Sequence, residues 1–300
     1  MKKLFTFRFA IIITLIMNLA LVGCKEIDEN IEVETVTQTE APELPYPVEI
    51  GAFVFKNAPE TLVSLSPALT EIICELGFSD VLIGRSSYCT YPESISEINT
   101  MGSSANPDVA AISQAAPALL ISQSPIAKKD IVTIEAAGTR VMIMPSPSSV
   151  DELYSNYVSI SAIFSGKLNA DSDGKKATLP LKNALSEAEN SIGSYVYILD
   201  SYLSVANDTT FIGDFMSHFG QNAVSDDAIS LSSDELRELN PEYVFIASPV
   251  SYTKFCEKFD ELDAVKNDHV IVIDKDIQER LERPTSRLSE TVYKILDEIK

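Results

Sequence analysis

The side chains that most often perform enzymatic chemistry are few in this sequence of 300 residues. It has only two histidines, His218 and His269, and neither has other metal-ligand side chains spaced around it. A three-histidine zinc site is therefore excluded. The sequence contains no Gly-x-Ser-x-Gly elbow, Walker loop, Gly-x-Gly-x-x-Gly or His-Glu-x-x-His, and no pair of its many carboxylates stands out. We therefore predict a binding protein rather than an enzyme, with no catalytic residue and no metal site.

Cys24 is the cysteine whose surroundings predict a modification. Three basic residues within the first eight positions precede an apolar run from Phe9 to Val22, which is the pattern of a secretory signal. The run ends in Leu21-Val22-Gly23-Cys24, which looks like a bacterial lipobox. That resemblance implies cleavage before Cys24 and acylation of its sulfur; the alternative is an uncleaved N-terminal membrane anchor. Both alternatives predict an extracytoplasmic protein attached to the cell membrane, and we favour the lipid anchor.

The three cysteines of the body do not form a disulfide framework, because an odd number cannot pair completely. Cys74 falls on the apolar face of a predicted helix and Cys256 in a helical stretch, so we predict that both are core residues. Cys89 lies in a loop with two tyrosines. It is either a small packing residue or a thiol that reaches a metal held by a bound ligand.

The charge of the chain excludes two classes of partner. The formal net charge is −21, although the first 23 residues contribute three positive charges and no negative one. An acidic surface of this kind repels nucleic acid and anionic lipid headgroups, so we predict no nucleic-acid partner. Residues 24–47 are rich in Glu and Thr, contain Pro at three positions and have few apolar side chains. This composition predicts a disordered acidic tether.

Short apolar runs alternate with helical patterns along the body. The first unit consists of a strand at Thr61–Leu65 and a helix that Ser66 caps and Gly77 ends, with Pro67 in the first helical position. Further strands are predicted at Asp80–Gly84, Ala118–Ser122, Arg140–Met144, Tyr195–Leu199, Tyr243–Ala247 and His269–Ile273. This alternation predicts two α/β lobes with mainly parallel sheets. Ligands usually bind at the carboxyl ends of parallel strands, so Ser66 and Pro67 lie at a candidate site.

The predicted elements divide the chain into five segments. Pro145-Ser146-Pro147 interrupts both helix and strand and marks the end of the first lobe. Two helical patterns follow, and the second is expected to kink or to start late near Pro180. We therefore predict a lipoprotein signal at 1–23, a tether at 24–47, an N-terminal α/β lobe at 48–147, linking helices at 148–193 and a C-terminal α/β lobe at 194–300.

Six motifs in the same order resemble the solute-binding proteins of ABC importers for vitamin B12 and iron complexes. They are Thr61–Glu71, Gly84 with Ser87–Pro92, Asn106-Pro107 with Pro117–Ile121, Ser233–Glu242, Ala264–Ile273 and Arg283–Arg287. The resemblance extends from about Pro47 to Lys300. It implies two Rossmann-like lobes joined by a rigid linking helix, with one ligand in a cleft between them. It further implies delivery to an ABC permease that separate ATPase subunits drive, with no reaction and no intrinsic cofactor in this chain.

The resemblance also implies a set of ligand-binding residues. Vitamin B12-binding members line the cleft with a proline at the first helix start, a tyrosine in the aromatic loop, several tryptophans and an arginine from the last loop. Pro67, Tyr88 and Arg283 match three of these. The chain has no tryptophan, and Gln123 falls where one of them would be. We therefore expect either a cobalamin-like corrinoid or an Fe(III) chelate, and the amide of Gln123 favours a ligand with more hydrogen-bonding groups.

Acidic residues on each lobe are candidates for docking to the permease. In the family one glutamate on each lobe pairs with permease arginines. Asp234, with Glu235 beside it, matches in the second lobe. In the first lobe the matching residue is Ala110, so either Asp108, two residues earlier, replaces the acid or this contact is lost. The alternative for all three acids is capping of a helix N-terminus.

Two other function classes remain open at this point. The absence of tryptophan and the presence of Ala110 are compatible with an extracellular sensor or scaffold that keeps the fold without transport. An extracellular hydrolase is the third class, and it lacks a recognisable nucleophile and base. Tyr91 is either a cleft residue or part of the core.

Overall fold

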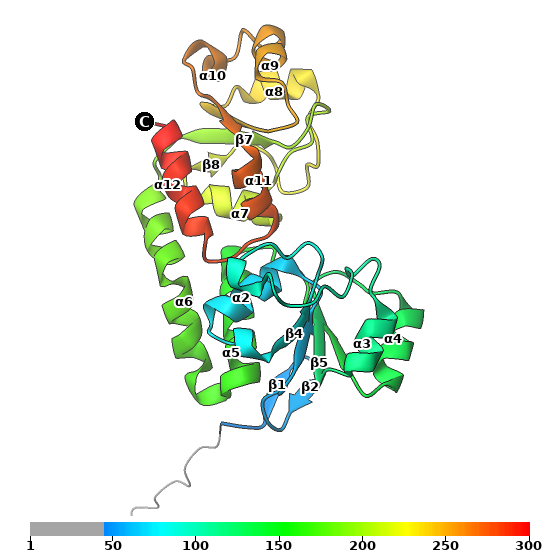
Figure 1. Ribbon diagram of the computed structural model, residues 1–300. Coiled ribbons are helices and arrows are strands. Elements are labelled where there is room, and N and C mark those ends of the chain that lie inside the picture. The colour runs from blue at the N-terminus through cyan, green and yellow to red at the C-terminus, as the bar shows by residue number, and fades with distance from the viewer. Residues whose placement is uncertain (1–44) are drawn as a thin grey trace, which may run out of the picture. The chain divides into compact units, whose positions relative to one another are not determined.

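Two parallel sheets, each with helices on both faces, organise the chain (Figure 1). The structure is a computed structural model and describes residues 45–300, all of which belong to one compact unit. The predicted signal, Cys24 and nearly all of the predicted tether lie outside the described residues. Among residues 45–300, no helix has the length and apolarity needed to cross a bilayer. The prediction of two α/β lobes with parallel sheets is confirmed.

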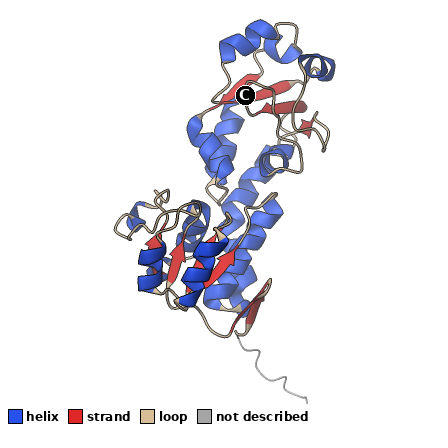
Figure 2. Cartoon of the chain, turned by 90° about the vertical axis from the view of Figure 1, so that its right-hand side faces the viewer, coloured by secondary structure: helices blue, strands red, loops and turns tan. Residues whose placement is uncertain are grey.

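The first sheet has the strand order β4-β3-β5-β6. Its strands are β3 (Leu62–Ser64), β4 (Leu82–Arg85), β5 (Leu119–Ser122) and β6 (Arg140–Ile143). Successive residues of β3 enter different hydrophobic clusters, because side chains alternate between the faces of a strand. Leu62 packs in a cluster with α2 (Pro67–Glu75) and α5 (Val150–Ser165), whereas Val63 packs in a second cluster with α3 (Val109–Ala115) and α4 (Lys128–Ala136). Figure 2 shows these helices on the two faces of the sheet.

Small elements complete the first lobe. The strands β1 (Val48–Ile50) and β2 (Phe53–Phe55) form an antiparallel hairpin at the beginning of the described chain. Two short 3₁₀ helices lie at η1 (Ser79–Val81) and η2 (Glu93–Ile95). The helix η2 directly follows the loop that contains Tyr88 and Tyr91. This loop therefore runs from the end of β4 to the start of η2.

Two long helices connect the lobes. They are α5 and α6 (Lys167–Ala188), and α6 runs without interruption through Pro180. The expected late start near Pro180 is therefore wrong, since α6 begins at Lys167. Gly174 is needed for packing: a Cβ atom at this position would lie 2.7 Å from Cγ2 of Val158 on α5. This absence of a side chain lets the two helices approach closely.

The second sheet has the strand order β10-β9-β7-β8. Its strands are β7 (Ser194–Ile198), β8 (Gln221–Asn222), β9 (Tyr243–Ala247) and β10 (Val270–Ile273). Helices α8 (Ser233–Leu239), α9 (Tyr252–Lys258) and α10 (Asp263–Lys266) share a cluster with one face of it. Helices α7 (Phe211–Ser217), α11 (Lys275–Glu282) and α12 (Leu288–Glu298) lie against the other face, and α12 packs along α6.

One hydrophobic cluster joins the two lobes. It contains Leu62 and Leu69 of the first lobe, Tyr157 and Leu181 of the linking helices, and Phe245 of the second lobe. Because all of these side chains are buried in one packed interior, the lobes are held by a continuous core rather than by flexible strands. The linking helices therefore form a stiff support for any site between the lobes.

The helix α11 was not predicted. The expectation from sequence was a loop between the last strand and Arg283, but residues 275–282 form two turns of helix. Asp274 begins it, because its Oδ1 accepts a hydrogen bond of 2.8 Å from the backbone N–H of Ile277. Arg283 consequently occupies the end of a helix, which limits where its side chain can go.

Candidate functional site

The carboxyl edge of the first sheet brings three predicted ligand residues onto neighbouring strands. Pro67 follows β3, Tyr88 follows β4 and Gln123 follows β5, and β3 lies between the other two. Ser66 caps α2, since its Oγ accepts from the backbone N–H of Leu69 at 3.3 Å. The same hydroxyl donates to Oε1 of Gln123 at 2.7 Å. The start of α2 and the end of β5 are thus directly connected.

Tyr88 projects from a loop that Arg85 holds in place. The side chain of Tyr88 is 61% exposed. The Nε of Arg85 donates to the carbonyl oxygens of Ile95 and Ile98, both at 3.0 Å, and its Nη1 donates to that of Cys89 at 2.8 Å. Hydrogen bonds from a charged donor are among the stronger ones in proteins. Sequence reasoning missed Arg85, although an arginine at the end of a buried strand was a usable signal.

Arg283 lies at the end of α11, on the second lobe, and its side chain is half-buried. Its positive charge is one of the influences that lower the pKa of Glu71 on α2, although burial outweighs them. Arg283 is therefore within electrostatic reach of the helix that begins with Pro67. The structure thus places Pro67, Tyr88 and Gln123 after neighbouring strands of the first sheet, and Arg283 on the second lobe within electrostatic reach of α2.

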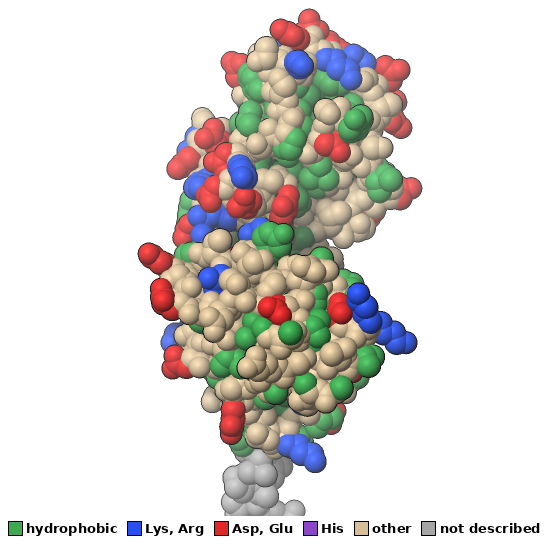
Figure 3. Space-filling view, turned by 45° about the vertical axis from the view of Figure 1, so that its right-hand side comes forward, with side chains coloured by type: hydrophobic (Ala, Val, Ile, Leu, Met, Phe, Trp, Pro, Cys, Tyr) green, Lys and Arg blue, Asp and Glu red, His purple; other side chains and the backbone are tan. Residues whose placement is uncertain are grey.

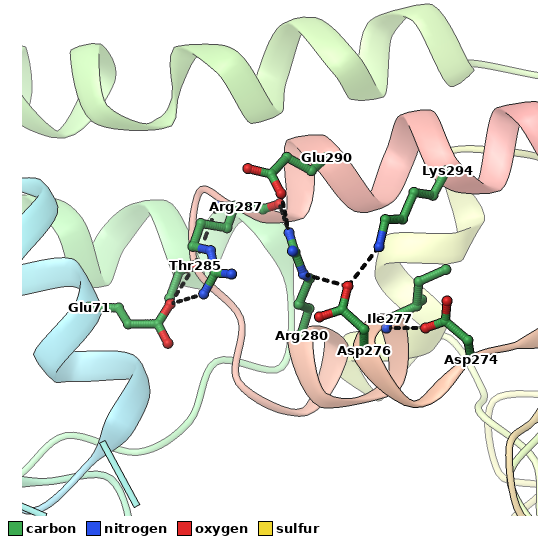
Figure 4. Close-up of polar contacts among 9 residues, drawn as sticks. All are labelled: Glu71, Asp274, Asp276, Ile277, Arg280, Thr285, Arg287, Glu290 and Lys294. Carbon is green, nitrogen blue, oxygen red and sulfur yellow. Dashed lines mark hydrogen bonds and ion pairs between the residues drawn. The ribbon is translucent and has the colours of Figure 1, made fainter. Parts of the chain in front are cut away.

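Six polar residues join the two lobes beside this site, and we call them the lobe-bridging cluster: Glu71, Glu75, Tyr157, Thr285, Ser286 and Arg287. Arg287 forms an ion pair of 3.1 Å with Glu71, and Thr285 donates to the same carboxylate at 3.5 Å (Figure 4). Ser286 donates through Oγ to Glu75 at 2.9 Å and through its backbone N–H to the Tyr157 hydroxyl at 2.7 Å. Tyr157 in turn donates to Glu75. Sequence reasoning did not find this cluster.

Burial dominates the ionisation of the cluster. It raises the pKa of Glu71 and of Glu75, while hydrogen bonds from Arg287 to Glu71, and from Tyr157 and Ser286 to Glu75, act in the opposite direction. Burial also raises the pKa of Tyr157, and the neighbouring Glu75 carboxylate raises it further. The two carboxyl groups therefore hold protons more tightly than exposed glutamates do.

A test of this ionisation is the pH dependence of stability. A carboxyl whose pKa is higher folded than unfolded stabilises the fold fully below its unfolded pKa of about 4.3, and this contribution is lost as pH rises through the raised pKa. We expect Glu75→Gln to remove that loss, so the variant should lose less stability than wild type as pH rises above the unfolded pKa. Urea unfolding at each pH measures it.

The control for this experiment is a carboxyl group whose pKa is shifted in the opposite direction, that of Glu152. The Ser148 backbone N–H lowers the pKa of Glu152, which is exposed near the start of α5. The Glu152 carboxylate stabilises the fold above the ordinary pKa of a glutamate, and this stabilisation is lost as pH falls through its lowered pKa. Glu152→Gln should therefore change only the acid limb of the profile. A Glu75→Gln profile parallel to that of wild type would contradict the assignment.

Charged side chains of both signs gather where the second lobe meets the first (Figure 3). On α11 and α12, Arg280 pairs with Asp276 at 3.3 Å and with Glu290 at 2.5 Å. Lys294 pairs with Asp276 at 2.6 Å. These pairs lie within one lobe, whereas the Arg287–Glu71 pair crosses to the other (Figure 4).

Two pockets among the described residues lie away from the predicted site. One, of about 480 Å³, lies between the β2–β3 segment and Arg140. The other, of about 770 Å³, lies between α5, α6 and the end of α7. Neither is lined by Pro67, Tyr88, Gln123 or Arg283.

Two strongly exposed apolar side chains at the second sheet were missed by sequence reasoning. Tyr202 follows the carboxyl end of β7 and is 85% exposed, and Ile229 is 79% exposed. The segments that contain them pair, since the N–H of Val205 donates to the carbonyl of Ile229 at 3.1 Å. An aromatic residue just after a predicted strand was the signal that could have identified Tyr202.

The predicted docking acids have different local roles. Asp108 caps α3 through a 2.9 Å bond from the N–H of Ala111, and Glu235 completes a capping box with Ser232. Asp234 makes no cap; it pairs with Arg237 at 3.2 Å, and its side chain is 98% exposed. The capping alternative thus describes Asp108 and Glu235, and leaves Asp234 available to a partner.

The body cysteines are free thiols in the structure. Cys89 is buried, its Sγ lies 3.2 Å from Oγ1 of Thr70, and burial raises its pKa. Burial also raises the pKa of Cys74 to about 11. Neutral buried thiols are poor metal ligands, so Cys89 fits the packing interpretation. Within residues 45–300, no group of three or more His, Cys, Asp or Glu side chains is arranged to hold a metal.

Comparison with known proteins agrees with this arrangement. A Bacillus subtilis (strain 168) protein named uncharacterized ABC transporter substrate-binding lipoprotein YvrC is 26% identical over 258 residues, covering 79% of this chain and 81% of that protein. A possible iron-binding periplasmic solute-binding protein from Staphylococcus epidermidis has a similar fold, with a TM-score of 0.67 and 20% identity over 81% of this chain and 99% of that one. The periplasmic vitamin B12-binding protein BtuF of Vibrio cholerae has a TM-score of 0.62 and 19% identity over 80% and 96%.

The family comparison covers most of the chain. Residues 62–277, from β3 to α11, match the family described as periplasmic binding protein. This range includes three of the four predicted ligand residues, Pro67, Tyr88 and Gln123. The chain belongs to the periplasmic binding protein family, whose members bind solutes and are not enzymes.

Proposed function

We propose that this protein is an extracytoplasmic, lipid-anchored solute-binding protein that captures a corrinoid or an Fe(III) chelate and delivers it to an ABC permease. The observation that supports the proposal most is the grouping of Pro67, Tyr88 and Gln123 on adjacent strand ends, with Arg283 near α2. The names of its relatives, which include a substrate-binding lipoprotein and a vitamin B12-binding protein, agree with it.

The proposed residues have complementary roles. Pro67 and Tyr88 offer apolar and aromatic surface to a flat macrocycle or chelate, and Arg283 offers a cation to its carboxylate, amide or phosphate oxygens. The Nε2 of Gln123 is buried without a hydrogen-bond partner, and an acceptor on the ligand would satisfy it. On the second lobe, Tyr202 adds an exposed aromatic ring at the end of β7.

Thermal shift with cobalamin, haem and a ferric siderophore complex tests the ligand class. A ligand that binds only the folded protein stabilises it, by about 2.7 kcal/mol at a concentration of about 100 Kd. For a domain of this size we expect a rise in Tm of roughly 5 to 10 °C. Tyr88→Ala and Arg283→Met should reduce the rise for the same ligand without changing the Tm of the free protein. No rise with any of the three ligands would overturn the ligand assignment.

Membrane attachment through Cys24 is part of the proposal. Cys24→Ser removes the sulfur that would be acylated, so metabolic labelling with a fatty acid should mark the wild-type protein and leave the variant unlabelled. If wild type takes up no label and still stays in the membrane fraction, the first 23 residues act as an uncleaved anchor and the lipid is not needed.

Permease docking is proposed for Asp108 on the first lobe and for Asp234 with Glu235 on the second. We expect Asp234→Ala to reduce ligand uptake several-fold at unchanged Tm and unchanged ligand affinity, because an exposed rim charge affects association more than folding. Uptake is measured in cells that express each variant at the same level. Asp297→Ala is a matched control, since Asp297 is also exposed and pairs with a cation three residues later. Equal uptake in both variants would contradict the docking role of Asp234.

The alternative function is an extracellular sensor or scaffold that keeps the fold without transport. Two observations favour it: the absence of tryptophan and the exposed Ala110 at the expected docking position of the first lobe. A sensor would bind its ligand and leave uptake unchanged when its gene is deleted. Ligand uptake in the deletion strain therefore separates the two functions.

A further inference from the structure

From the last loop, Arg287 contacts two other parts of the molecule around the proposed ligand site, the tyrosine loop and α2. Its guanidinium carbon lies 3.7 Å from the centroid of the Tyr91 ring, in the loop that also contains Tyr88. Its Nη1 lies 3.1 Å from Glu71 on α2, one turn after Pro67. Its own segment, residues 283–287, begins with Arg283. No other arginine among residues 45–300 makes both an aromatic contact and an ion pair between the lobes.

These contacts are shielded enough to fix a geometry. The side chain of Arg287 is 23% exposed and that of Glu71 is 11% exposed. Partly buried pairs are less screened by salt than surface pairs, and a planar guanidinium can hold an aromatic face and a carboxylate together. Figure 4 shows Arg287 directed toward Glu71 across the space between α2 and the last loop.

Tyr91 has an accessible part left for a ligand. Its side chain is 42% exposed, although the guanidinium covers one face of the ring. The guanidinium thus lies over one face of the ring while part of the side chain stays accessible. A ring whose rear face is held by a cation keeps one orientation, which suits stacking against a flat ligand.

We propose that Arg287 is a positioning residue of the ligand site: held by Glu71, it fixes the ring of Tyr91 for stacking and the segment that presents Arg283. Arg287 itself touches no ligand. Arg85 holds the tyrosine loop from within the first lobe, and Arg287 holds it from the second. The tyrosine loop is therefore held from both lobes when the last loop is docked on α2. The ligand part of this inference rests on the proposed function, whereas the ordering of the two loops does not.

Hydrogen exchange without ligand tests the ordering. In Arg287→Met, amide exchange should become about tenfold faster in peptides spanning 86–92 and 283–288, because a cation–π contact and a charged hydrogen bond are lost. Lys294→Met is the matched control: it removes an ion pair from the same region, but that pair stays within the second lobe. It should leave exchange at 86–92 unchanged. Unchanged exchange at 86–92 in Arg287→Met would overturn the proposal.

A conservative variant keeps the test valid if Arg287→Met folds poorly. Arg287→Lys retains the charge near Glu71 and loses the planar group over Tyr91. It should give intermediate exchange at 86–92 with nearly normal exchange elsewhere. A general destabilisation would instead raise exchange throughout both lobes, and such a uniform rise would contradict a positioning role.

Ligand affinity tests whether Arg287 positions the Tyr91 ring for binding. The probe is whichever of cyanocobalamin, haemin or a ferric siderophore complex raises the Tm of the wild-type protein. Arg287→Met should weaken Kd about tenfold, and Tyr91→Leu by a similar factor. The double variant should be little weaker than either single one, because the arginine acts through the ring. If the losses of affinity of the two single variants add up in the double variant, Arg287 does not act through the Tyr91 ring. If wild type binds none of the three probes while exchange at 86–92 rises as expected, the proposed function fails and the positioning role of Arg287 stands.

Discussion

Replacing Tyr157 by phenylalanine should lower the free energy of unfolding by about 2–3 kcal/mol. Tyr157 is fully buried, and its hydroxyl accepts from the Ser286 backbone N–H and donates to Glu75. Phenylalanine keeps the ring in the core and removes only the hydroxyl. The N–H and the carboxylate then each lose a partner in a region that water does not easily reach, and an unsatisfied buried group costs more than a normal hydrogen bond gains.

Urea unfolding with a common slope measures this change. Tyr154→Phe is the control, because Tyr154 lies three residues earlier on α5 and its hydroxyl donates to the exposed Asp171. The control should lose far less stability, since exposed polar pairs contribute little. Equal losses in the two variants would show that the lobe-bridging cluster adds nothing beyond an ordinary surface contact.

Replacing Gly213 by alanine should destabilise the protein by about 3 kcal/mol. A Cβ atom at this position of α7 would lie 1.8 Å from the carbonyl oxygen of Asn207 and 2.9 Å from the backbone nitrogen of Asp208. Backbone atoms cannot rotate away, so the helix and the preceding loop must move apart. That loop follows β7 and includes the segment near Tyr202, so any ligand contact there should weaken as well.

Gly84→Ala is the comparison that isolates this effect. Its added Cβ would also be close to its neighbours, but these are side-chain atoms of Met101, and the nearest is its Sδ at 2.5 Å. A methionine side chain is flexible and can shift, so the loss should be about 1 kcal/mol. Chemical unfolding of both variants measures the two losses in the free energy of unfolding. A Gly213→Ala loss no larger than that of Gly84→Ala would contradict the rigid contact between α7 and its preceding loop.

The stiffness of the joint follows from two independent features. A continuous hydrophobic cluster passes from the first sheet through α5 and α6 to the second, and the lobe-bridging cluster adds polar contacts beside the ligand residues. The hydrophobic cluster resists separation of the lobes, whereas the polar contacts fix the position of the last loop against α2. We therefore expect ligand capture to involve local adjustment of the loops around α2 more than rotation of whole lobes.

The sequence by itself determined the features that depend on neighbouring residues. Ser66, Pro67 and Gly77 delimit α2 as expected, because caps and helix ends are set by side-chain to backbone bonds over a few residues. The predicted strand Tyr243–Ala247 has the bounds found in the structure. The alternation of strand and helix was sufficient for two parallel α/β lobes, since it requires only local periodicity.

Tertiary structure alone decided what joins those elements. Glu71 and Arg287 are 216 positions apart, and nothing local to either residue indicates that they meet. In the sequence, Glu71 and Glu75 are ordinary polar positions of an amphipathic helix. Only the folded chain places the last loop against them. The path of α6 through Pro180 and the close contact at Gly174 depend likewise on packing against α5. The physical reason is that packing and long-range charge pairs can override local propensity, and they exist only once the lobes are assembled.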